Sequence, residues 1–137
     1  KGSRSIMEGS FRTEIVSPEK VIFSGDCSMT TLPGYEGDMS ILKNHIPIIT
    51  FLRPGLIKIK MDGEKNEEFF IQDGVVEFFN DILVILSSSA INKKNLSKKF
   101  IDNLNSETNE KLSKKDINDQ ERYILSHQLD ILKEIST

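Results

Sequence analysis

A run of alternating glycines and acids, followed by a histidine, is the part of this sequence best suited to chemistry. Glu36 and Asp38 flank Gly37, and His45 follows after a short apolar stretch. Carboxylates near an imidazole occur in acid–base catalysis, in metal sites and in polar contact surfaces, and glycine-rich loops can also cradle phosphates. Each of these uses requires its own companion residues elsewhere in the chain.

The companions of a metal or phosphate site are missing from the sequence. The two histidines, His45 and His127, lie in different halves of the chain, and Cys27 is the single cysteine. A zinc site needs three or four clustered ligands at characteristic spacing, so we expect no metal site. Neither of the common glycine motifs that bind phosphates occurs, and the loop at 34–37 opens no predicted helix. We therefore expect no cofactor.

Nucleophilic catalysis lacks support as well. Ser40 lies near His45, but no motif places an acid that would orient the histidine. Cys27 suits a small buried side chain in a strand better than a reactive thiol. We expect that the chain is not an enzyme by itself, and we interpret the acidic loop and His45 as a contact surface on a rigid scaffold.

Composition sets further limits. The chain has 137 residues and a mass of 15.6 kDa, enough for one domain or a small domain with an appendage. The net charge of -3 argues against a nucleic-acid partner. No apolar run approaches the roughly 20 residues that cross a bilayer. We expect residues 1–10 to be a tag remnant, ahead of a native Met7, and a disordered N-terminus.

Residues 11–90 predict a β-sandwich of about ten short antiparallel strands. Short apolar–polar alternations are separated by turn residues at regular intervals, which is typical of sandwiches and barrels. The second alternation is expected to stop at Gly25. The alternation after Gly55 places Ile57 and Ile59 on one face, with Met61 continuing that face. Lysines 58 and 60 occupy the opposite face, as in a half-buried strand.

Residues 91–137 predict an antiparallel helical hairpin. Glycine and proline vanish there, and apolar residues recur at helical spacing. The segment at 106–110 is expected to interrupt the first helix, and Ser113 with Asp116 resembles a capping box that would start the second. Helices this short are marginal in water, so the apolar stripe must pack on the sandwich or on a partner. We expect this part to be mobile and regulatory.

Four stretches together carry a family resemblance. They are EIVSPEKVIFSGD (14–26), LPGYEGDMSILKNHIPIIT (32–50), LRPGLIKIK (52–60) and IQDGVVEFFNDILVILSSSA (71–90). In this order, and with a helical hairpin after them, they resemble the epsilon subunit of bacterial F-type ATP synthase, which is homologous to the mitochondrial delta subunit. The second stretch is the most specific of the four.

The resemblance implies a role in the central stalk of the rotor. The sandwich would bind the gamma subunit and rest on the polar loops of the membrane c-ring, so that proton-driven rotation reaches the catalytic head. Glu36, Gly37, Asp38 and His45 match the family's loop at the base of the sandwich, which faces the c-ring. The hairpin would reach the catalytic beta and alpha subunits and inhibit ATP hydrolysis. The implied location is peripheral, on the cytoplasmic face of the bacterial inner membrane.

The hairpin departs from the family's nucleotide-binding pattern. Members that bind ATP in this subunit carry an acid and an arginine where the first helix begins. Here Leu96 matches that motif, but Ser97 replaces the acid and Phe100 replaces the arginine. Both lost groups supply charge-assisted hydrogen bonds, so no nucleotide binding is expected.

A different class of function is a free-standing β-sandwich that binds a ligand, with the hairpin as a lid. That hypothesis predicts aromatic side chains exposed in a cleft. The chain has no tryptophan, and most of its eight phenylalanines lie in patterns that bury them.

Overall fold

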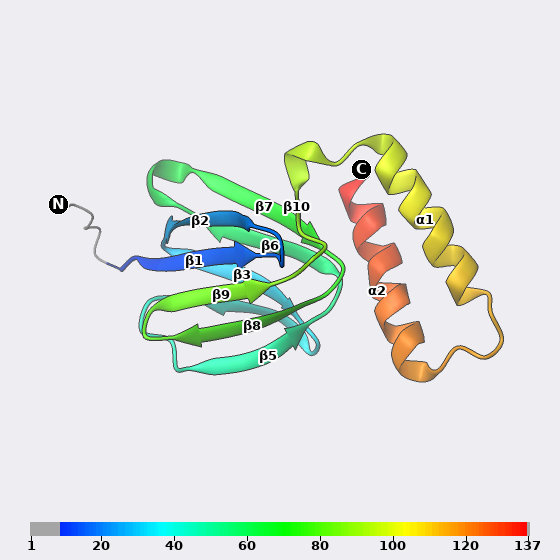
Figure 1. The fold of residues 1–137 in the computed structure, drawn as a ribbon, viewed down its shortest axis with the longest axis horizontal. Coiled ribbons are helices and arrows are strands. Elements are labelled where there is room, and N and C mark those ends of the chain that lie inside the picture. Colours follow the sequence, from blue (N-terminus) through cyan, green and yellow to red (C-terminus); the bar gives the residue numbers. More distant parts are fainter. Residues whose placement is uncertain (1–8, 137) are drawn as a thin grey trace.

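The computed structural model describes residues 9–136, which form ten β-strands followed by two α-helices (Figure 1). The expected tag remnant and disordered start fall mainly on residues 1–8, outside the described residues. The strands are β1 (Phe11–Val16), β2 (Val21–Cys27), β3 (Met29–Gly34), β4 (Gly37–Ile41), β5 (Ile48–Leu52), β6 (Gly55–Lys60), β7 (Asn66–Ile71), β8 (Gly74–Phe79), β9 (Ile82–Leu86) and β10 (Ile91–Asn92). The helices are α1 (Lys98–Leu112) and α2 (Asp119–Ile135), with 3₁₀ turns η2 (Asp62–Glu64) and η3 (Lys93–Asn95).

The strands form one sheet that curls into a sandwich. Their order is β10-β7-β6-β3-β5-β8-β9-β1-β2, and β4 pairs with β3 off this path. The predicted sandwich is confirmed, but the strands are not all antiparallel, because β1 runs parallel to β9. These two strands are far apart in the sequence, so no hairpin turn forces them to run in opposite directions.

Strand β6 shows how the sequence pattern becomes burial. Ile57 and Ile59 are buried in the core while Lys58 and Lys60 are exposed, as the alternation predicts. Successive side chains of a strand point to opposite faces, so Lys58 and Lys60 share a face with Leu56. The lysines are exposed, whereas Leu56 is buried in a second apolar cluster. Met61 follows the strand and packs against the core from a half-buried position.

Strand β2 is longer than predicted. Gly25 was expected to end it, but Gly25 pairs with Thr13 and the pairing continues until Cys27 meets Phe11. Glycine weakens a strand without preventing its backbone from pairing, and burial of Cys27 extends the strand to the core. Fourteen buried apolar residues make up the sandwich core: Phe11, Ile15, Cys27, Leu32, Ile41, Leu52, Ile57, Ile59, Phe69, Ile71, Val76, Phe78, Leu83 and Ile85.

The first helix does not break where the sequence indicated. It begins after Ser97, whose hydroxyl accepts a hydrogen bond from the backbone N–H of Phe100 at 3.0 Å, and runs unbroken to Leu112. Thr108, in the expected interruption, is buried, and its hydroxyl accepts a hydrogen bond from Gln128 of α2 at 2.9 Å. Packing between the helices therefore overrides the weak helix propensity of this segment.

The second helix starts later than predicted, with a different cap. Ser113 is the C-terminal cap of α1 and not the start of a capping box. The box is formed instead by Asn118 and Glu121: the Asn118 side chain accepts from the Glu121 N–H at 2.8 Å, and the Glu121 carboxylate accepts from the Asn118 N–H at 3.1 Å. The predicted antiparallel hairpin itself is present (Figure 1).

The hairpin packs on one end of the sandwich through a second apolar cluster. Its buried members are Leu56 and Phe70 from the sheet and Leu104 and Leu132 from the helices. In Figure 1, α2 lies between the sheet and α1, so α2 makes most of this contact. No helix within residues 9–136 combines the length and apolar character that crossing a bilayer requires.

Candidate functional site

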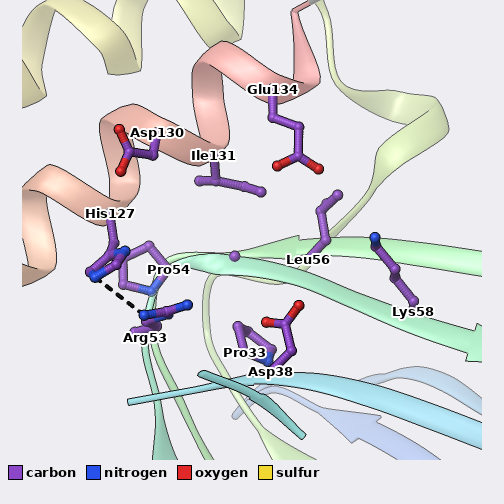
Figure 2. Close-up of a pocket in the computed structure, with 11 residues that line it drawn as sticks. Pro33, Asp38, Arg53, Pro54, Leu56, Lys58, His127, Asp130, Ile131 and Glu134 are labelled. Carbon is purple, nitrogen blue, oxygen red and sulfur yellow. Dashed lines mark hydrogen bonds between the residues drawn. The ribbon is translucent and has the colours of Figure 1, made fainter. Parts of the chain in front are cut away.

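The acidic loop is the tip of the β3–β4 hairpin. Gly34 pairs with Gly37, so Tyr35 and Glu36 form a two-residue turn. Gly37 has a φ of 128°, a conformation that side chains disfavour, and this explains why glycine stands there. The Glu36 and Asp38 side chains are both exposed. Asp38 also lines a small cavity of about 170 Å³ between the sandwich and α2 (Figure 2).

His45 lies at the opposite end of the sandwich. Its ring packs edge-on against Phe78, with 5.9 Å between ring centroids, and Nδ1 is 2.7 Å from the Ile46 carbonyl oxygen. The neighbouring Asn44 N–H donates to the carboxylate of Asp81 in the β8–β9 turn. All of β4 separates this loop from Gly37, roughly 13 Å at about 3.3 Å per residue. A contact surface that includes both the acidic loop and His45 therefore has to extend along β4.

The structure gives no support to a catalytic or metal-binding use of these residues. Ser40 hydrogen-bonds to Thr31, at 3.1 Å between hydroxyl oxygens, and no bond joins it to His45 among the described residues. The described part of the chain contains no cluster of three histidine, cysteine or acidic groups able to hold a metal. Cys27 is fully buried, and burial raises the pKa of its thiol, which keeps it protonated and unreactive.

An exposed apolar face covers the outside of β5, β8 and β9. We call this the outer apolar face, and its large members are Ile49 and Phe51 on β5, Phe79 on β8, and Ile82 and Leu86 on β9. Ile49 and Phe51 are 73% and 66% exposed. The strand register places Phe51, Val75 and Leu86 in one row across the sheet, and Phe79 opposite Ile82.

A hollow of about 670 Å³ adjoins the row that contains Phe51 and Leu86. Contiguous exposed apolar patches on small proteins commonly mark surfaces that bind another protein, a membrane or a ligand. Sequence reasoning did not single out this face. The signal was available, because β5 and β9 are apolar on both faces in a sandwich that has only one core.

Polar contacts fix α2 to the sandwich beside the apolar cluster. Arg53, in the loop before β6, donates through one guanidinium nitrogen to the Tyr123 hydroxyl and to His127 Nε2, both at 3.2 Å (Figure 2 shows the bond to His127). The Tyr123 hydroxyl in turn donates to the carbonyl oxygen of Tyr35. The two tyrosine rings are stacked, with centroids 5.9 Å apart. We call Tyr35, Arg53, Tyr123 and His127 the latch.

The positions compared with the family's nucleotide motif serve the hairpin itself. The Ser97 side chain caps α1, and Phe100 packs against the apolar cluster beneath the hairpin. A capping hydroxyl and a half-buried phenyl ring offer no charge to a phosphate group. Both residues therefore have structural uses.

Comparison with known proteins places the chain in a family. The family model described as "ATP synthase, Delta/Epsilon chain, beta-sandwich domain" matches residues 10–93. The chain is 42% identical over 132 residues to the ATP synthase epsilon chain of Pelagibacter ubique (strain HTCC1062), covering 95% of this chain and 100% of that protein. It is 32% identical over 126 residues to the ATP synthase epsilon chain of Parvibaculum lavamentivorans, covering 89% of this chain and 92% of the other.

Solved structures agree on the fold. A chain in the cryo-EM structure of Euglena gracilis mitochondrial ATP synthase, which contains OSCP, F1 and the c-ring, superposes with a TM-score of 0.72 at 17% identity. That superposition covers 98% of this chain and 84% of the other. From its sandwich, its hairpin and its similarity along nearly its whole length, the chain belongs to the family of ATP synthase delta and epsilon chains.

Proposed function

We propose that this chain is the epsilon subunit of a proton-translocating F-type ATP synthase and works in the central stalk of its rotor. It makes no bond in ATP, and it transmits rotation from the c-ring through the gamma subunit to the catalytic head. The outer apolar face carries this proposal, because a family member with an exposed apolar sheet face needs a protein partner to cover it. The alternative of a free-standing ligand-binding module leaves that face uncovered.

The gamma subunit is the partner we propose for the outer apolar face. Burying an apolar row between two rigid bodies gives affinity without a large conformational cost, which suits an element that transmits torque. A few central aromatic and aliphatic side chains commonly dominate such contacts. Phe51 and Ile49 are the most exposed large apolar side chains of β5 and are the anchors we propose.

Charge substitution in the full-length chain tests the gamma contact. Ile49→Glu with Phe51→Glu should weaken gamma binding by at least about thirtyfold, since one anchor is worth about 2 kcal/mol or more. Both side chains point to solvent, so the melting temperature should change little. Lys60→Glu, on exposed β6 surface, is the matched control. If the double variant co-purifies with gamma as well as the wild-type chain does, this face is not the contact.

For the c-ring contact we propose Glu36, Gly37 and Asp38, because an exposed acidic hairpin tip suits basic loops on a partner. A contact that also includes His45 has to extend along the whole of β4. The test is proton pumping per ATP hydrolysed in reassembled complexes that carry Glu36→Gln with Asp38→Asn. We expect fewer protons pumped per ATP hydrolysed, with an unchanged melting temperature of the isolated chain.

The matched control for the acidic tip is Asp62→Asn with Glu64→Gln, which neutralises two acids in the exposed η2 turn. If proton pumping per ATP hydrolysed is unchanged in both double variants, the acids of the β3–β4 tip make no contact with the c-ring. A large fall in melting temperature of the tip variant would instead assign these acids to the fold.

We also propose that the hairpin restrains ATP hydrolysis by reaching the catalytic beta and alpha subunits after it leaves the sandwich. Two observations support a detachable hairpin: it contacts only one end of the sandwich, and its own buried members are few. The complex would lie at the cytoplasmic face of the bacterial inner membrane, with this chain attached peripherally. Complexes whose chain ends at residue 96 should hydrolyse ATP faster than complexes with the full chain, and equal rates would contradict the restraint.

A further inference from the structure

We propose that the latch is proton-sensitive: it holds the hairpin on the sandwich while His127 is neutral and releases the hairpin when His127 binds a proton. The docking equilibrium is a property of the chain alone. Its consequence for the assembled enzyme, that acidification frees the hairpin to restrain ATP hydrolysis, rests on the proposed function.

Hydrogen-bond chemistry determines the charge state of the docked histidine. A guanidinium group can only donate, so the 3.2 Å contact between Arg53 Nη1 and His127 Nε2 requires a bare, accepting nitrogen. The proton of the neutral ring therefore sits on Nδ1. An imidazolium carries protons on both nitrogens and has no acceptor to offer. Protonation thus removes this bond and places two cations against each other.

The sandwich fixes the position of Arg53, so that it cannot easily move away. Its backbone N–H donates to the Pro33 carbonyl at 3.0 Å, and the same guanidinium nitrogen also donates to Tyr123. The Tyr123 ring packs edge-on against His127, with centroids 4.4 Å apart. A shift of the imidazole away from Arg53 therefore disturbs Tyr123 and its bond to Tyr35 as well.

Several other charged groups surround the same cavity. Asp130 and Glu134 come from α2, Asp38 from β4 and Lys58 from β6 (Figure 2). Asp130 favours the protonated ring, but burial and the Arg53 charge outweigh it and lower the pKa of His127 below its ordinary value. Histidine is the side chain whose ordinary pKa lies between about pH 5 and 8, so the switch is assigned to His127.

The sign of the pH dependence follows. A docked state that lowers the pKa of His127 binds fewer protons than the released state, so acid favours release. Above the ordinary pKa of about 6.5 both states are neutral at His127 and docking is at full strength. As pH falls through that value, the released form gains protons first, and docking weakens. The apolar cluster of Leu56, Phe70, Leu104 and Leu132 continues to oppose release, so the latch biases the equilibrium.

The chain contains a natural reporter for this test. Its two tyrosines, Tyr35 and Tyr123, are both in the latch, and it has no tryptophan. Tyrosine fluorescence of the full-length chain, measured from about pH 8 to about pH 5.5, therefore reports the latch with little background. Amide-exchange protection of α2, corrected for the intrinsic rate at each pH, gives the docking equilibrium independently. We expect both to show a severalfold loss of docking with a midpoint near or below the ordinary histidine value.

Matched variants separate His127 from general acid effects. His127→Gln keeps an acceptor for Arg53 but cannot titrate, so its hairpin should stay docked across the range. Arg53→Gln removes the opposing cation and should reduce the pH response. His45→Gln removes the other histidine, at the far end of the sandwich, and should retain the wild-type response.

An unchanged wild-type signal over the pH range, or the same response in His127→Gln and Arg53→Gln as in wild type, would overturn the proposal. These measurements need no partner, so their failure leaves the gamma-binding assay intact. If the outer apolar face proves not to bind gamma, the pH dependence of the latch is unaffected.

Discussion

Two adjacent phenylalanines on β7 belong to different cores, and this allows the sandwich and the hairpin to be destabilised separately. Phe69 lies in the sandwich core, where its ring meets Phe23 with centroids 5.6 Å apart. Phe70 points to the opposite face of the sheet and is buried beneath the hairpin with Leu104 and Leu132. Phe70→Ala should therefore undock the hairpin, whereas Phe69→Ala should weaken the sandwich.

The expected size of each effect follows from complete burial. Phe70 is 0% exposed and Phe69 is 3% exposed, so each truncation removes almost a whole buried ring. Phe→Ala in a core costs about 3–5 kcal/mol. In the undocked state Phe70 is exposed in the wild type too, so its truncation costs little there. Most of the ~3–5 kcal/mol is therefore lost from the docked state and weakens docking. The docking constant should then fall by roughly two to three powers of ten.

Amide hydrogen exchange read by segment is the decisive assay. In Phe70→Ala, protection should fall in α1 and α2 while β1 and β9 keep wild-type protection. In Phe69→Ala, protection of the sandwich strands should fall, and denaturant unfolding should begin at lower concentration. Equal loss of protection in helices and strands of Phe70→Ala would mean that both cores form one cooperative unit, and the hairpin would then not be separately mobile.

Two further predictions concern the hairpin. Thr108→Val leaves the buried Gln128 amide without its acceptor and should destabilise the hairpin by about 1–3 kcal/mol. Adding Gln128→Leu should recover part of that stability, as measured by urea unfolding followed by far-UV circular dichroism. A further loss of stability in the double variant would contradict the assignment. With Ser97 as a cap and Phe100 in the apolar cluster, calorimetric titration with ATP should show no dissociation constant near about 1–10 μM, since two missing charge-assisted contacts are worth about 1.5–3 kcal/mol each. A clear isotherm in that range would contradict it.

The sequence by itself determined the parts of this protein that depend on neighbours along the chain. Alternation at Ile57, Lys58 and Ile59 predicted which face of β6 is buried, because the period of two is a property of the extended backbone. Loss of glycine and proline after Ala90 located the change from sheet to helices, although β10 carries the sheet to Asn92. Local signals failed where two elements compete for one residue: Ser113 suits a helix start, yet it ends α1.

Only the tertiary structure decided which distant residues share a surface. Asp38 and His45 are close in sequence but lie at opposite ends of the sandwich, because the extended strand β4 runs along the sandwich between them. Arg53 and His127 are 74 positions apart and yet hydrogen-bonded, because the hairpin folds back over the end of the sandwich. Spacing along the chain specifies periodicity, whereas contacts of this range depend on how whole elements pack, and no local pattern contains that information.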